Sequence, residues 1–228
     1  MRPHIICHMA SSIDGRIDGS TLASLMGKGE YERTGASLRG DAWICGRTTM
    51  QMHFAEKRRF TPRSRKQAAS PSVHVATRAR SYAIAVDTRG TLPWAGNDID
   101  GDHLLCITSE RVTLEYLADL RKKKISYIVT GGIGVDLGKA VRLLRKHFGI
   151  KRLLLEGGGH INGGFMQARL IDEISLLLIP GIDGRAGVPT VFDGVGPEHT
   201  HAVPLRLTSV TKRKNGTLWL RYTVLNKK

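Results

Sequence analysis

The stretch KRLLLEGGGHINGG, residues 151–164, decides the fold of this chain. Its first part, Lys151 to Leu155, is a short apolar run with a basic lead, which is typical of a buried parallel strand. Three consecutive glycines follow at residues 157–159, and glycines cost backbone entropy without contributing to a core. They make sense where the chain turns sharply and another group approaches its main chain. The stretch therefore predicts a strand, a glycine turn and a helix.

The residues around the glycine turn indicate a ligand site. We expect the helix to begin with Asn162 as its N-cap and with Ile161, Phe165 and Ala168 on one face. Backbone amides at such a helix start attract phosphate. Glu156 ends the strand, at the edge where open α/β sheets bind ligands. The stretch contains neither the dinucleotide fingerprint G-x-G-x-x-G nor a Walker loop, and a plain strand-to-helix turn is the alternative interpretation.

The sequence around this unit extends it into a regular alternation of strands and helices. A helical stripe is formed at three- and four-residue steps by Leu137, Ala140, Val141, Leu144 and Phe148. Gly149 is expected to end that helix. Strands at residues 127–130 and 174–179 complete a β-α-β-α-β run, which implies a parallel sheet covered by helices.

The remaining segments fit the same sheet. Further strands are expected at residues 4–9, 42–45, 73–76, 82–86 and 104–108, and helices at residues 30–39 and 113–121. Residues 54–72 and 181–204 are interpreted as long loops. Two alternating strands around Asn215-Gly216 predict a C-terminal β-hairpin. No linker or repeat marks a boundary, so we expect α/β architecture in a single domain over residues 1–228, with a mixed, mostly parallel sheet flanked by helices.

The charge balance is the most unusual bulk property. The chain has 35 Lys and Arg residues against 20 Asp and Glu residues, a formal net charge of +15. Such a balance attracts polyanions and anionic small molecules. Aromatic residues are few and do not alternate with the basic groups, so a platform that stacks nucleic-acid bases is not indicated. A solvated basic surface is the favoured interpretation, and a nucleic-acid-binding protein is the alternative.

The cysteines and the apolar runs indicate the compartment. Cys7, Cys45 and Cys106 all lie inside apolar runs, which predicts buried free thiols in a reducing cytoplasm and neither disulfides nor a metal site. No apolar run reaches the roughly 18 residues of a membrane helix, and the first residues do not have the pattern of a signal peptide. We therefore expect a cytoplasmic protein.

Several stretches together resemble one family, and they occur in that family's order over nearly the whole chain. The matching stretches are MASSIDGRI (9–17), DAWICGRTT (41–49), AVDTRGTLP (85–93), DLGKAVRLLRKHFGIKRLLLEGGG (136–159) and DEISLLLIPGIDG (172–184) with the closing hairpin. The combination resembles the reductase domain of riboflavin biosynthesis, which has a dihydrofolate-reductase-like fold. The zinc-ligand Cys/His pattern of the deaminase domain that such proteins often carry is absent.

The resemblance implies an NADPH-dependent reductase that converts the ribosyl group of a pyrimidine ribosylamino 5′-phosphate to its ribityl form. Hydride would pass from the nicotinamide to a sugar carbon, and the protein would hold the two in near-attack geometry. The family also implies a homodimer. A reductase of the same fold with another substrate, such as a pterin or a different carbonyl compound, is the alternative within this class.

The resemblance also assigns the cofactor's diphosphate to the glycine turn. Gly157, Gly158 and Gly159, with the amides of His160 and Ile161, match the positions where the family binds it. Only bare main chain permits so close an approach.

Two further stretches match cofactor contacts. Gly46, Arg47 and Thr49 correspond to a Gly-Arg-x-Thr turn that binds phosphate, and Thr88 and Arg89 match groups near the adenosine 2′-phosphate. An arginine that pairs with this phosphate is the chemical basis for selecting NADPH over NADH. Surface solvation of the two arginines is the alternative interpretation.

The resemblance assigns four residues to the nicotinamide and substrate region. Glu156 matches the family's acidic residue beside the substrate, and Ser12 and Asp14 lie in the SxDG turn that lines the nicotinamide and substrate region. His8 stands where the family usually has lysine or asparagine; it can face the substrate and titrate near neutral pH, or be a satisfied strand residue. The family's acidic, proline-containing turn after Thr49 is replaced here by MQMHFAEKRRF, residues 50–60, which leaves the exact substrate open.

Overall fold

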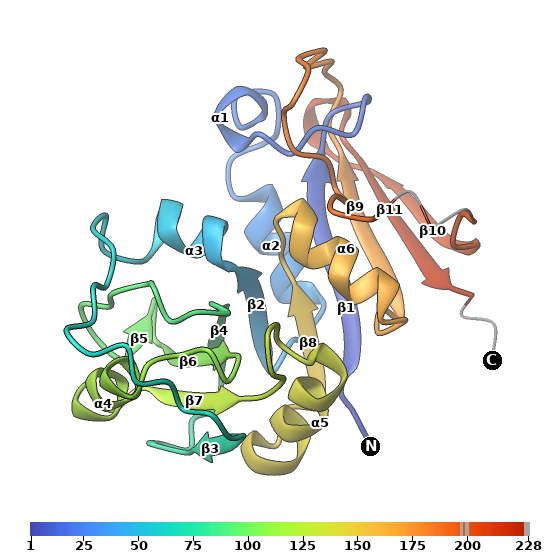
Figure 1. Ribbon diagram of the computed structural model, residues 1–228. Coiled ribbons are helices and arrows are strands. Elements are labelled where there is room, and N and C mark those ends of the chain that lie inside the picture. Colours follow the sequence, from blue (N-terminus) through green and yellow to red (C-terminus); the bar gives the residue numbers. More distant parts are fainter. Residues whose placement is uncertain (197, 199–200, 226–228) are drawn as a thin grey trace. The chain divides into compact units, whose positions relative to one another are not determined.

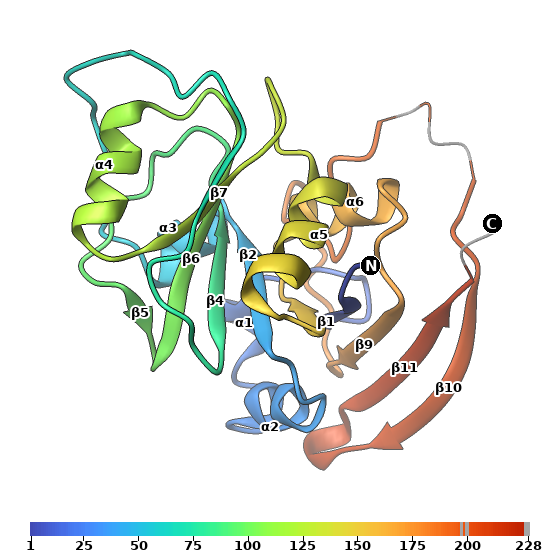
Figure 2. The same ribbon diagram turned by 90° about the horizontal axis from the view of Figure 1, so that it is seen from below.

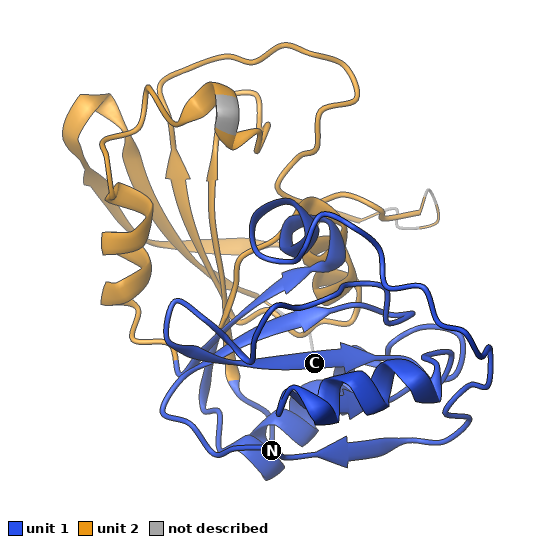
Figure 3. Ribbon diagram, turned by 90° about the vertical axis from the view of Figure 1, so that its left-hand side faces the viewer, with its two compact units in different colours: residues 1–3, 41–153 blue, residues 4–40, 154–228 orange. Residues whose placement is uncertain are grey.

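The computed structural model describes residues 1–196, 198 and 201–225 (Figure 1). The chain divides into two compact units, which Figure 3 distinguishes by colour. Unit 1 contains Met1–Pro3 and Asp41–Leu153, and unit 2 contains His4–Gly40 and Leu154–Lys228. The expectation of one reductase domain over residues 1–228 stays a prediction.

Unit 1 is a mixed sheet with helices between its strands. Its elements are β2 (Ala42–Gly46), α3 (Arg47–His53), β3 (Ser72–His74), β4 (Tyr82–Val86), β5 (Asp98–Ile99), β6 (Asp102–Thr108), α4 (Leu114–Lys122), β7 (Ser126–Val129), α5 (Leu137–Phe148) and the start of β8 (Arg152–Leu155). The strand order is β2-β4-β6-β7-β3. β2, β4, β6 and β7 run parallel, whereas β3 pairs antiparallel with β7 and β5 with β6.

The core of unit 1 lies between the parallel strands and α4. Tyr116, Leu117 and Leu120 of α4 belong to one buried cluster with strand residues such as Ala83 and Cys106, and Figure 2 shows α4 beside β6 and β7. Thr113 caps α4, because its side chain accepts a hydrogen bond from the Tyr116 amide at 3.2 Å.

α5 has the amphipathic pattern that its sequence predicts. Ala140, Val141, Leu144 and Phe148 are buried, and the helix ends at Gly149 with φ of 73°. This positive φ is in the left-handed region, which glycine adopts at less cost than other residues because it has no Cβ. The position of the helix and its end are therefore confirmed.

Unit 2 combines a parallel strand pair with the C-terminal hairpin. Its elements are β1 (His4–Ser11), α1 (Gly19–Leu22), α2 (Glu30–Ser37), the end of β8, α6 (Gly159–Gln167), β9 (Glu173–Leu178), β10 (Leu205–Lys212), the 3₁₀ turn η1 (Lys214–Gly216) and β11 (Leu218–Val224). The order is β10-β11-β9-β1, with β8 next to β1. β1 and β9 are parallel, and β11 pairs antiparallel with both β9 and β10. In Figure 2, β10 forms the outer edge of this unit.

The predicted α/β class, the mixed sheet flanked by helices and the C-terminal hairpin are confirmed. The long loop after α3 is confirmed as well, since residues 54–71 form no helix or strand. None of the described helices has the length and apolarity to cross a membrane.

One local prediction was wrong. α6 begins at Gly159 with Gly158 as its N-cap, whereas Asn162 was expected to cap it. Asn162 lies inside the first turn, and its side-chain amide donates to the Val191 carbonyl at 2.8 Å. Gly159 is itself the first residue of the helix, so the Asn162 side chain is not needed as a cap and binds the segment that contains Val191 instead. The short elements α1, α3 and β5 were not foreseen.

Candidate functional site

The glycine turn after β8 is packed closely from the inside of unit 2. Gly157 has φ of 89°, and a Cβ there would lie 2.9 Å from the sulfur of Met9. A Cβ on Gly159 would lie 2.3 Å from the Thr190 carbonyl oxygen and 2.5 Å from an Asp193 carboxylate oxygen. The peptide bond between Gly157 and Gly158 is cis. Close packing by Met9 and residues 190–193 thus gives a structural reason for two of these glycines.

The start of α6 offers backbone donors. The amides of Gly159, His160 and Ile161 stand in the first turn, where a helix supplies no acceptor of its own. Residues 190–193 bind the same turn, because the Asp193 amide donates to the Gly159 carbonyl at 3.0 Å. The Asp193 carboxylate is itself held by the amide and hydroxyl of Thr190 at 2.8 and 2.6 Å. The first turn can bind an anion, and the Asp193 carboxylate lies against it.

Glu156 is the charged group next to the turn. It is half-buried at the end of β8, and its charge acts on the thiol of Cys7 in β1. Burial is the main cause of the raised pKa of Cys7, and the Glu156 carboxylate raises it further. A carboxylate between a strand end and the first turn of a helix can accept hydrogen bonds from amino or hydroxyl groups of a ligand.

Ser12 and Asp14 form a turn that is tied to the 181–184 loop. The Ser12 hydroxyl donates to Asp14 Oδ1 at 2.6 Å, and the amides of Asp183 and Gly184 donate to the same carboxylate at 3.0 and 2.9 Å. These hydrogen bonds, first that of Ser12, lower the pKa of Asp14 far below its ordinary value. Asp14 is therefore ionised, and its contacts position the SxDG turn.

His8 is fully buried in the middle of β1. Its ring lies 4.4 Å from the ring of Tyr31 in a stacked arrangement. Nδ1 lies 3.0 Å from Ser175 Oγ, and Nε2 lies 3.1 Å from the Tyr31 carbonyl oxygen. Because a carbonyl only accepts, Nε2 carries the proton and donates. Trp219 Nε1 donates to Ser175 Oγ at 2.8 Å, so the serine hydroxyl can donate to Nδ1.

The electrostatics of His8 agree with this assignment. Burial is the largest influence and lowers the pKa of its imidazole below the ordinary value. Both ring nitrogens have partners within unit 2 when the ring is neutral. The geometry is that of a satisfied strand residue, the second of the two interpretations that its sequence allows.

The second group of candidate residues lies at one edge of unit 1. Gly46 of β2 is in register with Val86 of β4, so the residues that follow the two strands are neighbours. Arg47 and Arg89 are exposed there. Thr88 is half-buried, and its carbonyl accepts from the amide and hydroxyl of Ser109 at 3.0 and 2.8 Å. Thr49, also half-buried, lies in the first turn of α3.

Asp87 stabilises the turn that follows β4 at this edge. It is buried, and its carboxylate accepts from the amides of Thr91 and Leu92 at 2.5 and 2.7 Å. Burial raises the pKa of Asp87, while these hydrogen bonds and the charge of Arg47 oppose the rise. Asp87 thus fixes the turn that presents Thr88 and Arg89.

The structure adds polar groups that the sequence did not single out. Ser109 follows β6, and Thr108 and Thr130 end or follow the parallel strands β6 and β7. The hydroxyls of Thr108 and Thr130 are buried and have no hydrogen-bond partner within the described part of the chain. Their only signal in the sequence was a polar residue at the carboxyl end of an apolar strand, the edge where such sheets bind ligands.

The two groups of candidate residues belong to different units. Unit 2 holds Glu156, the 157–161 turn, His8, Ser12 and Asp14, and unit 1 holds Gly46, Arg47, Thr49, Thr88 and Arg89. Within unit 1 the structure brings its candidates to one sheet edge. Within unit 2 it pairs Ser12 with Asp14 and joins Glu156 to the turn, whereas His8 is enclosed by Tyr31 and Ser175. What each of these residues does stays a prediction.

Named relatives match most of the chain. A protein of Methanothermobacter thermautotrophicus named 2,5-diamino-6-ribosylamino-4(3H)-pyrimidinone 5′-phosphate reductase is 30% identical over 211 residues, which are 91% of this chain and 92% of that protein. A protein of Archaeoglobus fulgidus with the same name is 26% identical over 204 residues, 85% of this chain and 88% of that protein.

Solved structures share the fold. A pyrimidine reductase-like protein from Corynebacterium diphtheriae superposes with a TM-score of 0.75 at 18% identity, covering 99% of this chain and 93% of that chain. RibD of Acinetobacter baumannii gives a TM-score of 0.71 at 18% identity, covering 98% of this chain and 58% of that chain. In sequence, the family model of the RibD C-terminal domain matches residues 3–219 of this chain. The chain belongs to the RibD C-terminal domain family.

Proposed function

We propose that this chain is the reductase of riboflavin biosynthesis that reduces the ribosyl group of a pyrimidine ribosylamino 5′-phosphate to the ribityl form. The observation that carries the proposal is the match over 91% of the chain, at 30% identity, to a protein named as a reductase of such a compound. The net charge of +15 favours a phosphorylated substrate.

NADPH is the proposed cofactor. The donor set of each unit fits anionic groups of a dinucleotide: unit 2 has the first-turn amides of α6, which have no acceptor within their own helix, and unit 1 has Arg47 and Arg89, both exposed at the strand ends. The α6 amides would hold the diphosphate. An arginine, Arg89 or Arg47, would pair with the 2′-phosphate that distinguishes NADPH from NADH. When bound, the nicotinamide supplies the hydride.

The residues of unit 2 then have separate tasks. Glu156 would accept hydrogen bonds from the pyrimidine amino groups or the sugar hydroxyls and so orient the substrate. Asp14 and Ser12 would hold the turn beside it, since their polar atoms are already engaged in that turn. His8 would stay neutral and position β1 against α2 and β9, without exchanging a proton with the substrate.

Ligand-dependent melting tests the cofactor. NADPH should raise the melting temperature of the protein clearly more than NADH at the same concentration, because a ligand stabilises the state that binds it in proportion to its affinity. Arg89→Ala should reduce the difference between the two cofactors. Equal shifts for both cofactors, or none, would rule out the NADPH assignment.

Turnover tests the substrate. The absorbance of NADPH should fall when the pyrimidine ribosylamino 5′-phosphate is added, and the product should carry a ribityl chain. Oxidation of NADPH only with a pterin or with another carbonyl compound would favour the same-fold alternative. Binding of DNA with a steep salt dependence, without any effect of NADPH, would instead favour a nucleic-acid-binding protein.

We also propose a homodimer, formed through the C-terminal hairpin of unit 2. By register, one face of the β9-β11-β10 sheet is apolar except for Lys212 at the end of β10: Ile174, Leu176, Leu178, Leu218, Leu220, Tyr222, Val224, Leu205, Leu207 and Val210. Leu207 and Val210 are 51% and 53% exposed. On the same face lies an apolar cavity of about 400 Å³.

A second copy is the occupant that this surface fits. β10 is an eight-residue strand at the edge of its sheet, with every residue exposed. An exposed edge of this length pairs readily with another strand, and the same edge of a second copy can pair with it across a two-fold axis. The cytoplasm is the proposed compartment, since the three cysteines are free and buried.

A further inference from the structure

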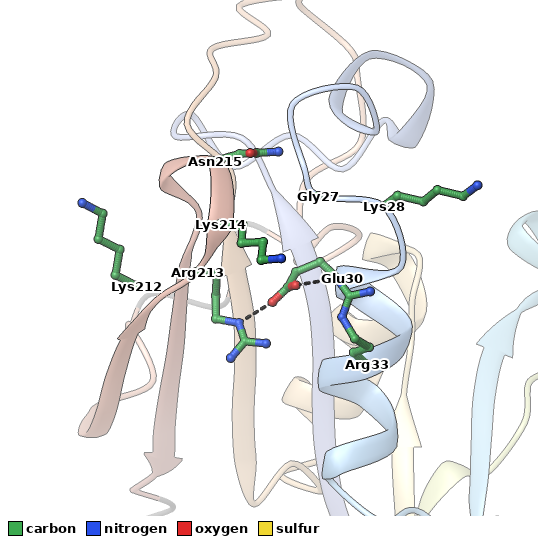
Figure 4. A pocket seen from close by; sticks show the side chains of 8 residues that line it. All are labelled: Gly27, Lys28, Glu30, Arg33, Lys212, Arg213, Lys214 and Asn215. Carbon is green, nitrogen blue, oxygen red and sulfur yellow. Dashed lines mark hydrogen bonds and ion pairs between the residues drawn. The ribbon is translucent and has the colours of Figure 1, made fainter.

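A polar cavity lies in unit 2, beside the turn between β10 and β11. It has a volume of about 520 Å³ and is lined by Gly27, Lys28, Glu30, Arg33, Lys212, Arg213, Lys214 and Asn215 (Figure 4). One wall is the start of α2 with the loop before it, and the other is the turn between β10 and β11. None of these residues belongs to the proposed cofactor or substrate site.

The floor of this cavity is a buried carboxylate between two guanidinium groups. The Glu30 side chain is only 3% exposed. Its Oε2 accepts from Arg33 Nη2 at 2.8 Å, and its Oε1 accepts from Arg213 Nε. These hydrogen bonds, first that of Arg33, lower the pKa of Glu30, so that it is ionised. Arg213 also lies over the ring of Trp219, with Cζ 5.7 Å from the ring centroid.

Glu30 uses only part of what the two arginines can donate. Each guanidinium has five N–H donors, and Glu30 engages one nitrogen of each. The arginines remain accessible, because the side chains of Arg33 and Arg213 are 57% and 30% exposed. The carboxylate therefore fixes their direction and leaves donors available to a ligand.

Three lysines complete the lining. Lys28, Lys212 and Lys214 are exposed, and none of them forms an ion pair with a carboxylate within the described residues. Figure 4 shows the Lys214 side chain turned toward Glu30, whereas the side chains of Lys28 and Lys212 extend away from it. Five basic side chains against one carboxylate give the cavity a net charge of four positive units.

We propose that this cavity is a binding site for a small oligophosphate anion. Fixed guanidinium groups with free donors and mobile ammonium groups around them are the means by which proteins bind phosphate oxygens. The excess charge of the lining fits several phosphates better than one. Among the described residues, no aromatic side chain lines the cavity, so it lacks a platform for the bases of a nucleic acid.

Calorimetric titration with inorganic triphosphate at constant ionic strength tests the site. Wild-type protein should bind one triphosphate in this cavity, at least about tenfold more tightly than orthophosphate. Lys214→Glu should weaken binding roughly tenfold or more, because loss of a charge-assisted hydrogen bond has about that effect. Lys28→Glu, on the opposite wall, should weaken binding less, because the Lys28 side chain extends away from Glu30.

Two matched variants provide the controls. Arg206→Glu makes an equal change of charge on β10, outside the cavity, and triphosphate affinity should stay within about twofold of wild type. Arg47→Glu makes the same change in unit 1, at the proposed cofactor site.

The proposal is overturned if Arg206→Glu weakens triphosphate binding as much as Lys214→Glu, since only the general field would then be at work. It is also overturned if only Arg47→Glu weakens binding, or if an oligonucleotide binds in a Lys214-dependent way while triphosphate does not bind. If NADPH fails to stabilise the protein while triphosphate binding still depends on Lys214, the proposed cofactor is wrong and this site remains supported.

Discussion

Trp219, Ser175 and His8 form one chain of hydrogen bonds that ends on the Tyr31 carbonyl. The chain has a defined direction, because the indole can only donate and the carbonyl can only accept. An additional proton on His8 Nδ1 would make Ser175 Oγ accept from both the imidazole and the indole, and its own proton would lose Nδ1 as an acceptor. At the scale of the residue, His8 thus links Ser175 to the Tyr31 carbonyl as a neutral imidazole.

This assignment predicts how stability depends on pH. The pKa of folded His8 is lowered by burial, whereas the unfolded residue has an ordinary value near 6.5. The contribution of His8 is fully present above about pH 6.5 and is lost as pH falls toward the folded pKa, because the unfolded chain then binds the extra proton. Urea unfolding should show the free energy of unfolding falling between pH 7.5 and 5.5, by at most about 1.4 kcal/mol per pH unit from this group.

His8→Gln should reduce that dependence on pH, because a glutamine amide can donate and accept without titrating. His53→Gln changes an exposed histidine of unit 1 and serves as the control. If both variants retain the wild-type dependence, His8 is not the group responsible.

Glu156 carries the prediction on activity. Glu156→Gln should lower kcat/KM roughly 10- to 100-fold, because a hydrogen bond to a charged group contributes about 1.5–3 kcal/mol. The affinity for NADPH should change less than about twofold. Glu32→Gln, at an exposed position of α2, should turn over like wild type. An unchanged rate for Glu156→Gln would remove this carboxylate from the proposed mechanism.

At the scale of the element, the sequence predicts best where a periodic apolar pattern decides the conformation. α5 was located from its buried stripe and its terminal glycine, and the strand, turn and helix of residues 151–164 were found in the right order. α3 was missed because only Met50 of its seven residues is buried. The start of α6 was misplaced because a glycine run lacks a capping side chain, so the asparagine downstream took that role in the pattern.

The same turn shows what a sequence alone does not reveal. Glycine at residues 157 and 159 was expected to leave room for a ligand. The structure shows Met9 and residues 190–193 packed against those α-carbons. A sequence gives no direct indication of which side of a bare main chain is occupied, because the packed segments lie far away along the chain. The ligand on the other side remains a prediction.

Gly159→Ala tests the packing. The added Cβ would lie 2.3 Å from the Thr190 carbonyl oxygen, so residues 190–193 must move away from α6. We expect the free energy of unfolding, measured in urea, to fall by about 1–3 kcal/mol. Gly19→Ala is the matched control in the same unit, since a Cβ there would meet no atom of the described residues within 4 Å, and its effect should stay within about 0.5 kcal/mol. Equal effects of the two substitutions would show that this contact is not a constraint.

At the scale of the whole molecule, the α/β class and the hairpin followed from the order of the strands, whereas the division into two units did not. The boundary falls inside β8, between Leu153 and Leu154, where the sequence is a continuous apolar run. No linker composition marks it, since the chain passes from one unit to the other within a single strand. The candidate residues were accordingly chosen without any sign of the boundary, and they fall in both units.

The apolar face of the hairpin predicts the oligomeric state. Leu207→Asp places a charge on this face and should convert the dimer to a monomer in light scattering after size-exclusion chromatography. Thr211→Asp introduces the same charge on the opposite face of β10, where Thr211 pairs with Trp219, and should leave the dimer intact. A wild-type protein that is already monomeric would refute the proposed interface.

The three free cysteines have a practical consequence. Cys7 lies in unit 2, Cys45 and Cys106 lie in unit 1, and all are buried. Burial raises the pKa of Cys7 and of Cys106, which keeps these thiols protonated and unreactive in the folded state. Alkylation must therefore wait for transient opening. Mass spectrometry of the alkylated peptides would report the opening rate of each unit separately, and no cysteine would have to be engineered.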